Sequence, residues 1–259
     1  MNLVQAVLLG VLEGATEFLP VSSTFHLIWA SRLLGLPDTE LQKLFEVVIQ
    51  SGAVLAILAL YARTILTDRA LVARLAVSFV PTAVVGLILY RTIKDVFFES
   101  AALQLLVFAG VGALFIVAER VWRGRAFDRT AAGLSYRDAA VVGLAQALAV
   151  VPGVSRAGAV ILALMALGVR RDDAARYSFL LALPTILAAG AYDLYQSRAA
   201  LGAGAGAIVP IAIGFASAFV AALIVVRWFV RYLQRHSLEP FGLYRLVLAG
   251  ALVLLVLSG

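Results

Sequence analysis

The chain has 259 residues, of which 63% are hydrophobic and 14% are charged, and its formal net charge is +6. A soluble domain has about 45–50% apolar and about 25% charged residues, so the composition excludes an ordinary soluble protein and predicts an all-α polytopic membrane protein. We expect a single membrane domain over residues 1–259, because no hydrophilic stretch is long enough to form a second one. The sequence contains no cysteine, which excludes disulfides, thiolate metal ligands and cysteine nucleophiles.

The apolar segments are of two kinds. Two of them, near 3–30 and 139–167, are broken midway by Pro20 and by Pro152-Gly153. Proline removes a backbone donor, and broken helices at membrane depth occur only where they are buried in protein or line a wet cavity, so we predict two re-entrant helical hairpins. The other six segments are uninterrupted and reach the length of about 20 residues that a spanning helix needs; they lie near 45–61, 75–90, 101–118, 177–195, 208–226 and 241–258.

The order of one hairpin followed by three spans occurs twice. Three pairs of anchors agree on one period, with offsets of 132, 129 and 140 residues for Pro20/Pro152, Pro81/Pro210 and Gly110/Gly250. We therefore expect two repeats, about 1–125 and 133–259, although chance similarity among segments rich in Ala, Val and Leu would look the same. A hairpin adds no net crossing and three spans add an odd number, so the second repeat should be inverted and the two hairpin tips should meet near the midplane.

The basic residues indicate the orientation. Fourteen Lys and Arg residues fall in loops on one side of the predicted topology, at 62–74, 119–137, 168–176 and 227–239, against five on the other. Basic loops face the cytoplasm, which places both termini outside. Topology therefore accounts for the net charge of +6, and no nucleic-acid partner is expected.

Glu13 and Glu17 lie in the first hairpin, four residues apart, and therefore on one face of a helix. Two carboxylates this close in low dielectric do not both stay ionised unless a proton or a cation compensates one of the charges. Hard oxygen ligands suit Mg²⁺ or Ca²⁺, so the pair predicts a divalent cation site. The alternative is a pair that faces a loop or water at a helix end.

Hydroxyl groups follow the first break at Ser22, Ser23 and Thr24, and His26 comes just after them. A serine becomes a nucleophile when a base lies within hydrogen-bond reach, and His26 could reach Ser23 across one helical turn. The competing interpretation is that these hydroxyls cap the helix that follows.

The second break combines Gly153, Ser155 and Arg156. Glycine permits close backbone approach, and the free amides of a helix start bind anions. Arginine adds a permanently charged fork that suits phosphate. Arg156 could instead be a structural counter-ion of Glu13 or Glu17, and the two roles are compatible.

Three stretches together resemble the undecaprenyl-diphosphate phosphatase family, also called the bacitracin-resistance family, and the similarity covers essentially the whole chain. They are Glu13-Gly-Ala-Thr-Glu17-Phe-Leu-Pro-Val-Ser-Ser-Thr24, Phe45-Glu-Val-Val-Ile-Gln50 and Pro152-Gly-Val-Ser-Arg156. The resemblance implies a multi-pass enzyme of the bacterial inner membrane that removes the terminal phosphate of undecaprenyl diphosphate, a polyprenyl diphosphate lipid. This reaction recycles the lipid carrier for peptidoglycan and other envelope glycans. The resemblance also implies inverted repeats with re-entrant hairpins and a need for a divalent cation.

The resemblance assigns roles to individual residues. It makes Glu13 and Glu17 the acidic pair, Ser23 the candidate nucleophile and His26 the motif histidine, with Ser155 and Arg156 as phosphate binders. In the mechanism that we expect, Arg156 and the amides after Gly153 hold the diphosphate. Ser23 or a water attacks the terminal phosphorus, and His26 or Glu17 moves the proton.

Three positions depart from the family pattern. Phe25 stands where the family has a glycine, and Ala157 and Val160 stand where it has hydroxyl side chains. Fewer donors around the phosphate predict weaker catalysis, a different head group or lost hydrolysis. The alternative function is therefore a polyprenyl-phosphate transporter or flippase that uses the same anion site without cleavage, and a third is an ion-coupled carrier of an unrelated small anion. The sequence leaves the oligomeric state open.

Overall fold

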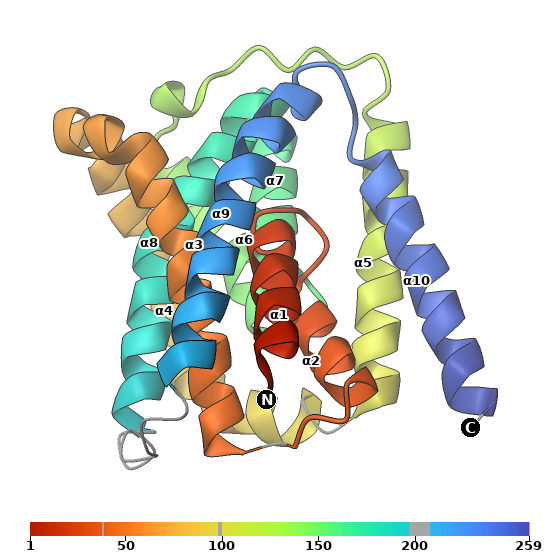
Figure 1. Cartoon of the computed structure of the whole chain (residues 1–259). Coiled ribbons are helices and arrows are strands. Elements are labelled where there is room, and N and C mark those ends of the chain that lie inside the picture. Colours follow the sequence, from red (N-terminus) through yellow and green to blue (C-terminus); the bar gives the residue numbers. More distant parts are fainter. Residues whose placement is uncertain (38, 98–99, 197–207, 259) are drawn as a thin grey trace.

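A computed structural model describes residues 1–37, 39–97, 100–196 and 208–258 of the chain, and within these ranges it is built of helices (Figure 1). The α-helices are α1 (Leu3–Thr16), α2 (Ser23–Leu33), α3 (Glu40–Thr67), α4 (Arg69–Phe97), α5 (Ala101–Val121), α6 (Tyr136–Ala147), α7 (Arg156–Ala166), α8 (Arg171–Gln196), α9 (Ile208–Leu233) and α10 (Glu239–Ser258). Two 3₁₀ turns, η1 (Ala131–Gly133) and η2 (Leu148–Val150), precede α6 and follow it. The predicted all-α polytopic fold is confirmed.

The six predicted spans correspond to α3, α4, α5, α8, α9 and α10, whose apolar helical stretches are 20–28 residues long. The four helices of the two broken segments are only 11–14 residues long. At a rise of 1.5 Å per residue they are too short to cross a hydrocarbon core of about 30 Å. Each broken segment is thus a pair of short helices joined by a tip, and three long helices follow each pair.

The first helix of each hairpin packs closely against a long helix of the other half of the chain. In α1, a Cβ added to Gly10 would lie 2.3 Å from the carbonyl oxygen of Gly214 in α9. In α6, a Cβ added to Gly143 would lie 2.2 Å from the carbonyl oxygen of Ser78 in α4. Small residues let the helix backbones touch in both places. This reciprocal packing is what two repeats would produce, and the inversion of the second repeat stays a prediction.

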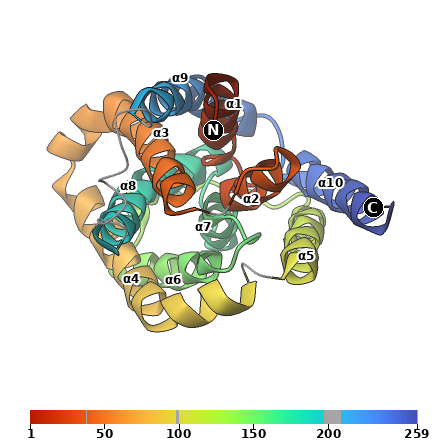
Figure 2. The same ribbon diagram turned by 60° about the horizontal axis from the view of Figure 1, so that its bottom comes forward.

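The interior of the molecule is centred on α7, which the other helices surround in Figure 2. Four apolar side chains of α7 are completely buried, namely those of Val160, Ile161, Leu164 and Met165. Both termini lie at one end of the helix bundle, and the loops that join α3 to α4, α5 to α6 and α9 to α10 lie at the opposite end (Figure 1). The loops that carry the basic excess therefore share one end of the molecule.

Candidate active site at the hairpin tips

The two hairpin tips have the same backbone conformation. Ser22, just before α2, has φ 67° and ψ 92°, and Ser155, just before α7, has φ 73° and ψ 110°. They are the non-glycine residues with positive φ in the described part of the chain, and they are 133 residues apart, as are Gly10 and Gly143. Such backbone conformations are strained in non-glycine residues and gather at functional sites. The strained serines therefore mark equivalent points of the two predicted repeats.

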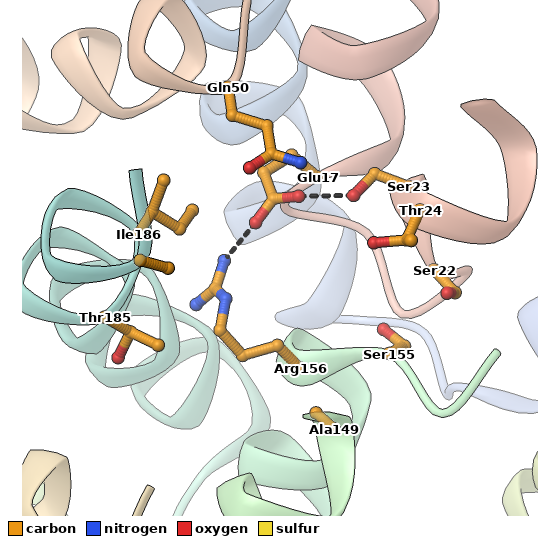
Figure 3. Close-up of a pocket in the computed structure, with 11 residues that line it drawn as sticks. Glu17, Ser22, Ser23, Thr24, Gln50, Ala149, Ser155, Arg156, Thr185 and Ile186 are labelled. Atoms are coloured by element: carbon orange, nitrogen blue, oxygen red, sulfur yellow. Dashed lines mark hydrogen bonds and ion pairs between the residues drawn. The ribbon is translucent and has the colours of Figure 1, made fainter. Parts of the chain in front are cut away.

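The tips meet at Glu17, which directly follows α1. One oxygen of the Glu17 carboxylate pairs with Nη2 of Arg156 at 2.8 Å, and the other accepts a short hydrogen bond from the Ser23 hydroxyl (Figure 3). Arg156 also donates from Nη1 to the carbonyl oxygen of Ser178 in α8, at 3.0 Å. The side chains of Arg156 and Glu17 are 11% and 9% exposed, so the pair is held mostly out of solvent. A nucleophile candidate, a carboxylate and a phosphate-binding cation are thus in direct contact.

A cavity of about 200 Å³ lies beside this contact. Since one water occupies about 30 Å³ of the liquid, the cavity has room for a phosphate group. Its lining includes the predicted residues Glu17, Ser22, Ser23, Thr24, Ser155 and Arg156. The side chains of Gln50 from α3 and Thr185 from α8 complete the polar lining, and Gln50 points toward Glu17 in Figure 3.

Glu13 lies one helical turn before Glu17 and is completely buried. Neither of its carboxylate oxygens has a hydrogen-bond partner, and the charged groups that act on it are Glu17, Glu46 and Arg156. No cluster of three His, Cys, Asp or Glu side chains suited to a metal occurs in the described ranges. Mg²⁺ commonly binds through one or two carboxylates plus substrate phosphates. The unpartnered oxygens of Glu13, together with Glu17, fit that kind of site.

His26 is buried, but the structure places its ring away from Ser23. Nδ1 lies 2.8 Å from the carbonyl oxygen of Ser22, and Nε2 lies 2.7 Å from the hydroxyl of Tyr244 in α10. A carbonyl oxygen only accepts, so Nδ1 carries the proton, and Nε2 of the neutral ring accepts from Tyr244. In this arrangement Glu17, and not His26, is the group that receives the Ser23 proton.

Two residues of the second tip serve the backbone. The Ser155 hydroxyl accepts from the amide of Gly158 at 3.2 Å, which caps α7, and donates to the carbonyl oxygen of Leu19 in the other tip at 3.4 Å. Gly153 has φ +100°, and a Cβ added to it would lie 3.2 Å from the amide nitrogen of Phe108. Its carbonyl oxygen accepts from Arg245, so Gly153 positions the tip and does not line the cavity.

The three departures from the family pattern are all completely buried and lie outside the cavity lining. The ring of Phe25 stacks on that of Phe108, with 3.8 Å between centroids and 6° between planes. Val160 packs in the main hydrophobic core, and Ala157 is buried beside it in α7. The expected shortage of donors around the phosphate is therefore not what these residues produce.

The structure also adds residues for which the sequence analysis had proposed no role. Gln50 and Thr185 were polar residues in predicted spans, and that signal could have marked them. Tyr244 and Arg245 lie in α10, more than 200 residues from the first tip that they contact, and no local pattern links them to it.

Comparison with known proteins gives a consistent result. A family profile described as "Bacitracin resistance protein BacA" matches residues 6–251. A protein of Thermus thermophilus named undecaprenyl-diphosphatase is 46% identical over 248 residues, which are 95% of this chain and 94% of that protein. Proteins of the same name from Sulfurihydrogenibium sp. and Campylobacter hominis are each 41% identical; the alignments cover 96% and 99% of this chain and 97% and 100% of theirs. The chain belongs to the bacitracin resistance protein BacA family.

Proposed function

We propose that this chain hydrolyses undecaprenyl diphosphate to undecaprenyl phosphate and inorganic phosphate, which returns the lipid carrier to the synthesis of peptidoglycan and other envelope glycans. The observation that carries the proposal is the contact of Glu17 with both Ser23 and Arg156 beside the cavity. The names of the similar proteins support hydrolysis of this diphosphate and give no support to the transporter alternative.

The terminal phosphate binds in the cavity between the tips. Arg156 provides a planar guanidinium that matches phosphate oxygens. The helices α2 and α7 both begin at the cavity, at Ser23 and Arg156, and helix N-termini stabilise anions through their free amides and their dipole. The hydroxyls of Ser22 and Thr24 add further donors. When Arg156 turns to the phosphate, Glu17 loses its counter-ion and is free to accept a proton.

In the reaction, the Ser23 oxygen attacks the terminal phosphorus and its proton passes to Glu17. The bond from that phosphorus to the bridging oxygen breaks, undecaprenyl phosphate leaves and it takes the proton from Glu17. A water then attacks the phosphoserine, Glu17 accepts the proton of the water and returns it to Ser23, and inorganic phosphate is released. Direct attack by water on the diphosphate would use the same proton acceptor without a phosphoserine, and trapping of labelled Ser23 distinguishes the two routes.

Glu13 and Glu17 are the residues that would hold a divalent cation, Mg²⁺ or Ca²⁺. Support comes from the buried and unpartnered oxygens of Glu13, and from the all-oxygen character of the donors around it. When bound, such a cation neutralises charge on the diphosphate oxygens.

The proposed location is the bacterial inner membrane, with both termini on the outer face. The excess of basic residues in the loops at the end opposite the termini supports this orientation. The partner in the bilayer is the polyprenyl diphosphate lipid itself.

The test is phosphate release from undecaprenyl diphosphate by the purified protein in detergent, with Mg²⁺, with Ca²⁺ and with a chelator. Glu17→Gln removes the proton acceptor and keeps the side-chain shape, so release should fall by more than about 10²-fold. Glu40→Gln, in the exposed first turn of α3, is the matched control. Absence of release from folded wild-type protein would refute the proposal.

A further inference from the structure

Arg245 is buried completely, although it carries a permanent charge. It lies in α10, and no carboxylate within the described ranges forms an ion pair with it. Burying a charge without a counter-ion is costly, and ionisable residues inside a membrane protein usually have a function. The mechanism proposed above does not use this residue.

The guanidinium of Arg245 binds three backbone carbonyls from three separate parts of the fold. Nε donates to Phe108 in α5 at 3.0 Å, Nη1 donates to Pro20 in the first tip at 3.2 Å, and Nη2 donates a short bond to Gly153 in the second tip. The guanidinium also lies over the ring of Phe108, 4.3 Å from its centroid. Arg245 is thus bonded to both tips at once.

The two tip carbonyls are equivalent in the predicted repeats. Pro20 and Gly153 are 133 residues apart, as are the strained serines Ser22 and Ser155, and each carbonyl lies two residues before its serine. Strained backbone persists only where the surroundings over-determine it. Arg245 supplies such a constraint at the same point of both tips.

The base of the Arg245 side chain is itself held rigidly. A Cβ added to Gly112 of α5 would lie 2.9 Å from the Cβ of Arg245, and one added to Gly242 of α10 would lie 2.6 Å from the carbonyl oxygen of Gly112. Because both glycines leave no gap, α5 and α10 form a close pair. The guanidinium therefore projects to the tips from a fixed position.

We propose that Arg245 is a positioning residue that holds the two hairpin tips in register, so that Glu17 and Ser23 of one tip meet Arg156 of the other. Little else joins the tips directly: the structure shows the hydrogen bond from Ser155 to Leu19 and the contact of Arg156 with Glu17. The second of these contacts must open when phosphate binds. A separate link is then needed to keep the tips aligned during the reaction. The role rests on the proposed function for its purpose, but the geometry that it predicts is measurable without activity.

The first measurement is the distance between spin labels at the two tips. The chain has no cysteine, so Leu33→Cys in α2 and Leu148→Cys in η2, at positions 62% and 64% exposed, introduce labels without background. We expect one narrow distance distribution in the labelled parent protein. Arg245→Gln should broaden it, and so should Arg245→Lys, because a single ammonium keeps the charge but cannot span three carbonyls.

The second measurement is kcat and KM for phosphate release by the same variants. A displacement of about 1 Å at reacting groups can cost about 10²-fold in rate, so kcat should fall by about that factor in both variants. KM should change much less, because the contacts of the lipid tail are untouched. The control is the double variant Glu119→Gln/Arg171→Gln, which removes a buried ion pair away from the cavity and should keep the narrow distribution.

Each outcome is decisive for the role of Arg245. If Arg245→Lys keeps the parent kcat and the narrow distribution, the three-carbonyl contact is not required and the proposal fails. If kcat falls while the distribution stays narrow in both variants, Arg245 acts through its charge and not by positioning. If Arg245→Gln does not fold, Arg245→Lys still decides the question. If the parent protein releases no phosphate, the proposed function fails, and the distance measurement still tests the positioning.

Discussion

Replacing Arg156 with lysine tests whether the enzyme needs the guanidinium fork or only a positive charge between the tips. The arginine makes two contacts in fixed geometry, from Nη2 to Glu17 at 2.8 Å and from Nη1 to the carbonyl oxygen of Ser178 at 3.0 Å. A lysine retains the charge, but its single ammonium cannot reproduce both directions or present two parallel donors to a phosphate.

The expected size of the effect follows from these contacts. A hydrogen bond to a charged group contributes about 1.5–3 kcal/mol, and the Arg156 side chain is 11% exposed, so solvent screens the interaction only weakly. One such bond lost in the transition state lowers kcat/KM by about 10- to 100-fold, at about 1.4 kcal/mol per tenfold. Arg156→Gln also removes the charge, and loss of one charge-stabilising donor typically costs about 10²–10³-fold.

The assay is the initial rate of phosphate release over a range of undecaprenyl diphosphate concentrations, with the thermal unfolding midpoint measured on the same samples. Arg120→Lys is the matched control, because Arg120 is 66% exposed and forms only a surface ion pair with Glu239. A kcat/KM for Arg156→Lys within twofold of the parent value would refute a role for the fork. Equal losses in Arg156→Lys and Arg120→Lys would show that the assay does not report on the site.

Three further predictions concern the surroundings of the site. Tyr244→Phe removes the donor to Nε2 of His26, worth about 1 kcal/mol, so kcat should fall about fivefold with little change in the unfolding midpoint; an unchanged kcat would show that this bond does not orient the ring. Gly14→Ala places a Cβ 2.2 Å from the carbonyl oxygen of Ala218, and overpacking of this kind costs about 1–3 kcal/mol, so the unfolding midpoint should fall, whereas Gly110→Ala meets nothing within 4 Å and should leave it equal or higher. Chelation of divalent cations should abolish phosphate release, and added Mg²⁺ or Ca²⁺ should restore it; full activity in the chelator would exclude the proposed cation.

Features that depend on local sequence could be predicted. The six spans follow from the length and apolar character of continuous segments, and all six helices occur where they were expected. The two breaks follow from proline and glycine, which act on the backbone within a few residues. The contact of Glu17 with Arg156 was expected as a counter-ion pair, because a buried carboxylate and a buried arginine in two converging tips need each other.

The partners that come from distant helices were decided by tertiary structure alone. His26 was expected to serve Ser23 from its place in the sequence, but its ring bonds to Tyr244, and Ser23 bonds to Glu17 instead. Arg245 gave no local sign that it would join both tips. The physical reason is that a spanning helix is apolar on every side, because lipid and protein interior are both apolar, so its hydrophobic pattern does not reveal which face turns inward. Only the packing of α10 against α5 directs these two side chains to the tips.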